Sequence, residues 1–324
     1  MSISTIFRVV FASVAFVFTP ITCHAEDAPP AWAYPIAPKD YAPPKDDGTV
    51  RHVPGSTKGY TLTEIRDLFF ALDWFPDSHP PMPSIVANGR KPNLRACGVC
   101  HRPEGIGGPE SASLAGLPAE YMLRQIADFR AGTRTTSVKE RAHVLRMIAA
   151  VKEATEDELK AAVAYYAAMK LPRRIKVIES DTVPTSYVPN WYYTSKNDGQ
   201  TEPLGARIIE MPDDEENFVN RDARVTFSAY VPKGSIERGK ALVDGADQDR
   251  IPACTTCHGT ALEGMDSIPP LAGRSPSMIV RQLYDFKTGN RHGSMAEIMH
   301  DNTAHMEMAD MIAIAAYLAS LPPS

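Results

Sequence analysis

Several features that would point to particular protein classes are scarce in this sequence of 324 residues. Positive charge is not in excess, because 34 lysines and arginines stand against 39 aspartates and glutamates. A nucleic-acid-binding protein shows a basic footprint, so we predict no nucleic-acid partner. Beyond residue 25, no apolar run approaches the ~20 residues of a membrane-spanning helix. Cysteine is also rare, with five residues, and their positions prove informative.

The first 25 residues have the pattern of a cleaved secretory signal. Arg8 precedes the apolar run 9–18, and a plausible cleavage site follows Ala25. The run is too short for an uncleaved anchor, and Thr22 before Cys23 disfavours a lipoprotein site. We therefore predict export to the periplasm without a transmembrane span, which still allows peripheral contact with the membrane.

Residues 26–81 are predicted to form an arm with one helix. Prolines and charges dominate residues 26–59, which suits an extended segment and not a core. Thr61 and Glu64 then form a capping-box pattern at the start of an amphipathic stretch that ends before Pro76. We expect a helix over Thr61–Trp74.

A long internal repeat follows the arm. Cys97-Gly-Val-Cys-His101 recurs 157 residues later as Cys254-Thr-Thr-Cys-His258. Further matches share this offset: Leu114–Gly116 with Leu271–Gly273, Arg124–Gln125 with Arg281–Gln282, Asp128–Phe129 with Asp285–Phe286, Gly132 with Gly289, and Arg134 with Arg291. The first copy then holds five extra residues, so the offset falls to 152. The chain therefore contains two copies of one domain, at 82–172 and 235–324.

Both copies are predicted to be all-helical. The expected helices are the amphipathic segments Glu120–Phe129 and Ser277–Phe286 and the Ala-rich segments Glu156–Met169 and Ala309–Leu318. Residues 173–234 break this pattern with scattered prolines and short β-rich pieces. We predict a long irregular linker there, with short strands, in which the acidic run 213–216 is a solvated loop.

Every cysteine that remains after signal removal lies in a C-x-x-C-H motif: Cys97, Cys100, Cys254 and Cys257. This motif is the attachment signature for c-type haem. Two thiols one helical turn apart reach the two vinyl groups of one haem edge, and the next residue, His101 or His258, faces the iron. The spacing disfavours two disulfides. A thioredoxin-like redox pair needs no following histidine, and neither copy offers the second ligand pair of a zinc site. We predict two covalently bound haem c groups.

The sixth ligand of each iron should come from further along each copy. A methionine opposite histidine raises the reduction potential and fills the last position of the iron, which suits electron transfer. Met147 and Met299 align at offset 152, and we predict them as the ligands. His143 and Met295, aligned one helical turn earlier, are the alternatives. Ordinary core packing is the usual role of such methionines.

Both copies resemble class I cytochrome c domains, and the tandem resembles the dihaem cytochrome c4 family. The resemblance covers 82–172 and 235–324 and is carried by C-x-x-C-H, Leu-Ala-Gly, Arg-Gln-x-x-Asp-Phe, Gly-x-Arg and, in each copy, the methionine eleven residues before the acid of the final helix (Glu158 or Asp310). In that family this methionine is the distal ligand, which implies Met147 and Met299. Pro269 matches a proline of the family, whereas the first copy has Ala112, so we expect that loop to pack differently.

The predicted fold is therefore all-α, with two cytochrome c domains in tandem, and the predicted protein is a periplasmic dihaem electron carrier without catalytic residues. Its partners would be redox proteins, namely a dehydrogenase or other donor and a respiratory acceptor. The alternative is a dihaem cytochrome c peroxidase, which needs one accessible sixth position. A candidate methionine in both copies argues against that enzyme, and a purely structural role would leave two redox centres unused. We expect the arm and the linker to dock to a partner.

Overall fold

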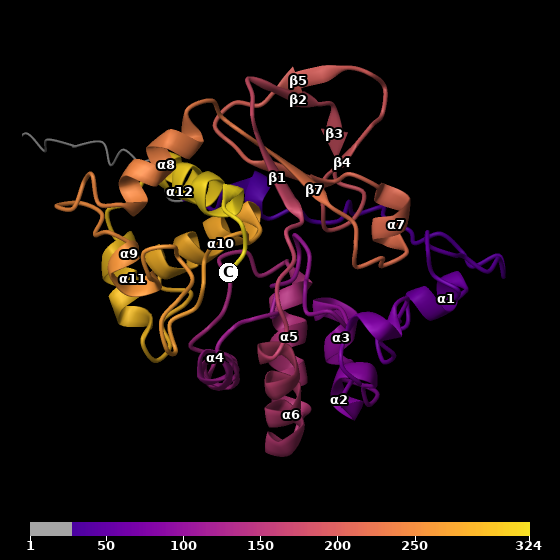
Figure 1. Ribbon diagram of the computed structural model, residues 1–324. Coiled ribbons are helices and arrows are strands. Elements are labelled where there is room, and N and C mark those ends of the chain that lie inside the picture. Colours follow the sequence, from indigo (N-terminus) through magenta and orange to yellow (C-terminus); the bar gives the residue numbers. More distant parts are fainter. Residues whose placement is uncertain (1–27) are drawn as a thin grey trace, which may run out of the picture.

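The computed structural model describes residues 28–324, and the predicted signal at 1–25 lies outside them. Two groups of helices, one from each repeat, lie beside each other, and short strands from the linker lie above them (Figure 1). Two helical domains in tandem with short linker strands were predicted, and this is confirmed. Within the described residues, no helix combines the length and apolarity needed to cross a membrane.

The first domain contains five helices: α2 (Ser84–Ala87), α3 (Cys97–His101), α4 (Ala119–Ala131), α5 (Ala142–Glu153) and α6 (Glu156–Ala167). The second contains α8 (Ser235–Val243), α9 (Thr255–His258), α10 (Pro276–Lys287), α11 (Ala296–Thr303) and α12 (Met308–Ser320). The four predicted helices are confirmed as α4, α6, α10 and α12. Capping boxes begin both final helices, Thr155 with Glu158 in α6 and Glu307 with Asp310 in α12.

Helix α8 was not predicted, and it lies directly against α12. A Cβ atom added to Gly239 would meet the Ala313 carbonyl oxygen at 1.9 Å. Only a glycine therefore permits this close approach of two helix backbones. The first domain has the one-turn helix α2 before its C-x-x-C-H motif and no helix as long as α8 there.

The linker is a folded unit of short strands and one helix. Strand β7 (Phe227–Val231) lies between β1 (Ile175–Glu179), with which it is parallel, and β6 (Ile209–Pro212), with which it is antiparallel. Two antiparallel pairs complete the unit: β2 (Thr182–Pro184) with β5 (Thr201–Pro203), and β3 (Ser186–Tyr187) with β4 (Thr194–Ser195).

The acidic run at 213–216 is largely exposed, as predicted, but it is not a loop throughout, because it caps and begins a helix. Asp214 caps the short helix α7 (Glu215–Val219) by accepting the Asn217 N–H at 2.9 Å. Asp213 accepts hydroxyl hydrogen bonds from Thr226 (2.5 Å) and Ser228 (2.7 Å). Carboxylates at a helix N-terminus satisfy free N–H groups, so the run has a local structural role.

The predicted helix Thr61–Trp74 was also wrong beyond its first turn. The capping box forms, but α1 spans only Leu62–Ile65. After it, the Asp67 carboxylate accepts the Phe69 N–H at 2.7 Å, a local bond that competes with the helix. The Ala71 N–H then donates to the Ala87 carbonyl at 2.8 Å. Ile65, Leu72 and Trp74 are buried together with Val53 in one cluster and not on one face of a helix.

The proline-rich arm, expected to stay outside any core, begins inside the second domain. Ala33, in the short 3-10 helix η2 (Ala31–Ala33), and Tyr34 belong to that domain's buried core. Arg281 donates to the Ala33 carbonyl at 2.8 Å, which fixes the arm to α10. The arm then continues to the first domain, where α1, the 3-10 helix η3 (Pro76–Ser78) and α2 follow. The arm therefore contacts both domains and connects them.

The two domains also meet in a reciprocal interface. The Thr135 N–H donates to the Asn290 carbonyl (2.7 Å), and the His292 N–H donates to the Thr133 carbonyl (2.8 Å). Two aspartates repeat this exchange: the Ser137 N–H donates to Asp285 Oδ1 (2.9 Å) and the Ser294 N–H to Asp128 Oδ1 (3.1 Å). Each contact recurs with the copies exchanged at offset 157, so an approximate two-fold axis relates the domains.

Candidate haem-binding sites

Each C-x-x-C-H motif lies on a short helix, α3 in the first domain and α9, with Cys254 at its N-cap, in the second. All four thiols are partly buried and form no disulfide with one another. Burial raises the pKa of Cys97 to about 12 and that of Cys254 to about 11. A dithiol redox pair depends on an easily formed thiolate, so these pairs differ from a thioredoxin-like site.

The two motif histidines are held in the same way. His101 Nδ1 lies 2.8 Å from the Ala112 carbonyl oxygen, and His258 Nδ1 lies 2.8 Å from the Pro269 carbonyl oxygen. A carbonyl only accepts, so Nδ1 carries the proton and Nε2 keeps its lone pair. Burial lowers the pKa of both histidines, which favours the neutral ring. The loop at Ala112 was expected to pack differently from the loop at Pro269. In this contact the two loops are alike, because the acceptor is a backbone carbonyl that alanine and proline both have.

A cavity adjoins each motif. The first, of about 220 Å³, is lined by Cys97, Cys100, His101, Met147 and the alternative His143. The second, of about 380 Å³, is lined by Cys254, Cys257, His258, Met299 and the alternative Met295. The structure thus brings together each predicted set of residues, with both candidates for the sixth ligand still present at each cavity.

Met147 and Met299 hold equivalent positions in the fold. Met147 lies on α5, eight residues before Thr155, the N-cap of α6, and Met299 lies on α11, eight residues before Glu307, the N-cap of α12. Met147 packs against the core of the first domain and Met299 against that of the second. Met295, by contrast, is 58% exposed.

His143 has a different environment from its counterpart Met295. Its ring meets Trp191 of the linker edge-to-face, with 5.0 Å between ring centroids. Its Nδ1 is buried and makes no hydrogen bond within the described chain. Burial, reinforced by the charges of Arg141 and Arg146, lowers the pKa of His143 to about 3. The ring is therefore neutral at physiological pH.

These residues fit a covalently held haem. The cavity walls are mostly apolar, and each presents two thiols, one histidine of fixed tautomer and one methionine thioether. Several residues line both cavities, and sequence reasoning did not place five of them between the two sites: Tyr121, Gln125, Arg134, Met278 and Gln282. The signal was present, because Gln125 and Gln282 are equivalent in the two repeats, but a repeat does not reveal which surfaces meet.

The chain is similar to one known family of proteins. The Cytochrome c family model matches residues 86–170 and 236–322. The thiosulfate dehydrogenase electron acceptor of Stutzerimonas stutzeri (strain A1501) is 25% identical over 236 residues, which are 72% of this chain and 82% of that protein. Cytochrome c4 of Azotobacter vinelandii is 26% identical over 230 residues, 69% of this chain and 84% of that protein. The crystal structure of reduced recombinant cytochrome c4 from Pseudomonas stutzeri covers 69% of this chain and 93% of its own, at 23% identity and a TM-score of 0.46.

The two family matches fall on the two repeats, and each contains one C-x-x-C-H motif beside a cavity. Two haem c groups are therefore bound covalently, through Cys97 and Cys100 and through Cys254 and Cys257. The chain belongs to the cytochrome c family and is a dihaem electron carrier whose tandem class I domains resemble cytochrome c4.

Proposed function

We propose that the protein is exported to the periplasm, accepts electrons from a dehydrogenase and passes them to a respiratory acceptor, without catalysing a reaction of its own. The main observation that supports this proposal is that each cavity combines a histidine of fixed tautomer with a methionine, and the two methionines hold equivalent positions in the two domains. A haem iron with these two ligands exchanges single electrons at a raised potential.

In this proposal His101 and His258 supply the proximal nitrogen, and Met147 and Met299 supply the distal sulfur. The backbone bonds at Ala112 and Pro269 hold each imidazole so that Nε2 is free for the iron. Met299 is favoured over Met295, because Met299 packs in the core and Met295 lies mostly exposed. Met147 is favoured over His143, because Met147 occupies the position in the fold that Met299 occupies in the second domain.

The donor class is supported by the relative named as an electron acceptor of thiosulfate dehydrogenase. The test uses the oxidised dihaem protein with purified thiosulfate dehydrogenase, with and without thiosulfate, followed by a membrane oxidase. We expect reduction that needs both enzyme and thiosulfate, and reoxidation by the oxidase. If other dehydrogenases reduce the protein and thiosulfate dehydrogenase does not, the donor is one of those other enzymes. Failure of every donor to reduce the protein reversibly would overturn the electron-carrier proposal.

A further inference from the structure

The two attachment segments differ in exposure. Gly98 and Val99, between the cysteines of the first motif, are buried, and Val99 is only 4% exposed. Their counterparts at offset 157 are Thr255, which is half-buried, and Thr256, which is exposed. The cysteines hold one edge of each haem, so the residues between them report how that edge is covered. The first attachment segment is therefore covered, and the second is partly open to solvent.

The arm supplies one part of this cover. Leu68 and Ala71 pack with Val99 and Cys100 in one apolar cluster, in which Ala71 is fully buried. A Cβ atom added to Gly98 would lie 2.7 Å from the Ala71 Cβ, so the arm touches the attachment helix without a gap. Nothing larger than glycine fits at that position while the arm stays in place.

The linker supplies the other part. Arg221 donates from Nη1 to the Val99 carbonyl at 2.5 Å, and its charge acts on Cys100. The Arg221 side chain lies partly buried beside the first motif. No residue of the second domain corresponds to it, because the linker occurs once in the chain.

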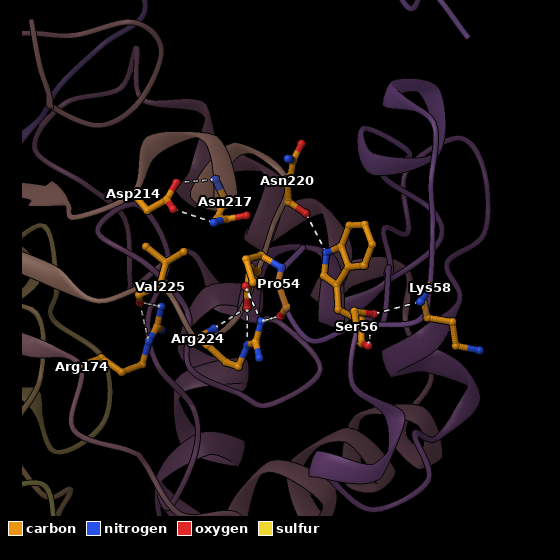
Figure 2. Close-up of polar contacts among 11 residues, drawn as sticks. Pro54, Ser56, Lys58, Arg174, Asp214, Asn217, Asn220, Arg224 and Val225 are labelled. Atoms are coloured by element: carbon orange, nitrogen blue, oxygen red, sulfur yellow. Dashed lines mark hydrogen bonds and ion pairs between the residues drawn. The ribbon is translucent and has the colours of Figure 1, made fainter. Parts of the chain in front are cut away.

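Arm and linker are joined into one cover. Trp74 donates its indole N–H to the Asn220 carbonyl at 2.8 Å, and Arg224 donates to the Pro54 carbonyl (Figure 2). The Arg224 guanidinium also lies 3.8 Å from the centre of the Phe75 ring. These contacts tie segments about 150 residues apart to each other across the first domain.

The linker also covers the distal side of the first domain. His143 and Arg146, the counterparts of Met295 and Ile298, both contact Trp191, with centroid distances of 5.0 Å and 5.9 Å. In the second domain the same surface is bare: Met295 is 58% and Ile298 51% exposed. Met265 is 47% exposed and bridges to Ile268, which lines the same cavity as these two residues.

Exposed carboxylates adjoin these apolar residues in the sequence: Glu263 and Asp266 flank Met265, and Glu297 and Asp301 lie on the same helix as Ile298. Exposed large apolar residues that gather at one place and have a charged rim mark an interaction site. An acidic rim attracts a partner whose own rim is basic, and repels an acidic one.

We propose that the second domain is the electron port of the protein: partners exchange electrons with it at the surface formed by Met265, Met295 and Ile298, and the first haem exchanges electrons through the second. The partner is a redox protein with an apolar centre and a basic rim. This inference rests on the proposed electron-carrier function and adds which of the two domains meets the partner.

The first test measures oxidation of the fully reduced dihaem protein by the cation tris(bipyridine)cobalt(III) at low salt. The variant Glu297→Lys/Asp301→Lys should slow the fast phase by about tenfold, because steering by charge changes association rates on this scale. The same variant should speed oxidation by the anion ferricyanide, and both effects should fade at high salt. The matched control, Glu153→Lys at the exposed end of α5, should leave both rates unchanged. An equal response of the two variants would overturn the proposal.

The second test compares two proteins with one haem each, Cys97→Ser/Cys100→Ser and Cys254→Ser/Cys257→Ser. The protein that keeps the second haem should react with the cobalt complex at least about tenfold faster than the one that keeps the first. Equal rates for the two proteins would contradict the proposal that the second domain is the electron port. If either variant fails to fold, the charge-reversal variants decide alone. Failure of the electron-carrier proposal would look different, since the wild type itself would then not be reduced and reoxidised reversibly.

Discussion

Arg134 and Arg291, equivalent residues of the two repeats, pair with each other in an antiparallel bridge across the domain boundary. Their guanidinium groups share two acceptors: Gln125 Oε1 accepts from Arg134 at 2.8 Å and from Arg291 at 2.7 Å, and Gln282 Oε1 accepts from them at 3.0 Å and 3.1 Å. Burial, together with the charge of Arg291, lowers the pKa of Arg134 to about 10. Two like charges are thus held together between the haem cavities by amide oxygens.

Replacing Gln282 with leucine should therefore destabilise the protein. The change removes one acceptor from the buried Arg291 and one from the partly buried Arg134, and an unsatisfied buried donor costs about 1–3 kcal/mol. We expect the free energy of unfolding of the dihaem protein to fall by about 3 kcal/mol, measured by urea denaturation. The control is Gln200→Leu at an exposed turn. A loss no larger than that of the control would show that the shared acceptors do not stabilise the interface.

Asp310 should make stability depend on pH in acid. Its side chain is fully buried and pairs with Arg250 and Arg238. Burial alone would raise the pKa of Asp310, but the hydrogen bonds from Arg250 and from the Glu307 backbone lower it overall, below 3.8. A carboxyl with a lowered pKa in the folded state stabilises the fold above its unfolded pKa, and this contribution is lost as pH falls through the folded pKa.

The variant Asp310→Asn should lose about 2 kcal/mol of stability at pH 7, less than a fully enclosed pair because both arginines are partly exposed. Below about pH 4 its deficit relative to the wild type should shrink. Urea denaturation at several pH values measures both effects, with the exposed Asp301→Asn as the control. A deficit that stays constant from pH 7 to pH 2 would contradict the assignment.

Replacing Met299 with histidine should lower the potential of the second haem while the haem stays attached. Imidazole lacks the preference of a thioether for ferrous iron, and attachment depends on Cys254 and Cys257. A redox titration should show a shift of tens to hundreds of mV, within the ~0.8 V that axial ligands span. Met295→His, one turn earlier and 58% exposed, is the matched control and should leave the potential unchanged. The reverse pattern would make Met295 the ligand.

The mature protein should contain two haems and no reactive thiol. The proposed cleavage behind Ala25 would leave four cysteines, and the two attachment motifs use all of them. Intact mass of the purified periplasmic protein, paired with thiol titration after denaturation, checks both statements. The mass of a single haem, or a thiol that reacts, would show that one motif is not used for attachment.

The sequence revealed those parts of the molecule that depend on local pattern or on repetition. The attachment motifs and the helices α4, α6, α10 and α12 follow from spacing and periodicity within one segment. The cover did not follow, because Trp74 and its acceptor Asn220 are 146 residues apart and no local pattern connects them. The helix expected to continue to Trp74 failed for the same reason: Ala71 pairs with Ala87, which the periodicity of one segment cannot show.

The residues of the candidate sites also fall into those that the sequence could predict and those that it could not. Repetition made Met147 and Met299 visible, and the cavities then showed that each lies near its motif. It also made Gln125 and Arg134 visible as matched residues, but their contact with the other copy depends on how the domains dock. The asymmetry of the two domains arises from the arm and the linker, which occur once and therefore have no counterpart to compare.

The closed sixth position of both irons is the central claim, and binding of carbon monoxide to the reduced protein tests it most directly. If Met147 and Met299 are ligands, carbon monoxide should bind neither haem on mixing, and hydrogen peroxide should not be turned over with a reduced electron donor. Ligation by His143 instead of Met147 would also close the first haem and would lower its potential. Rapid binding of carbon monoxide at one haem, with steady peroxide turnover, would contradict the account and indicate a peroxidase.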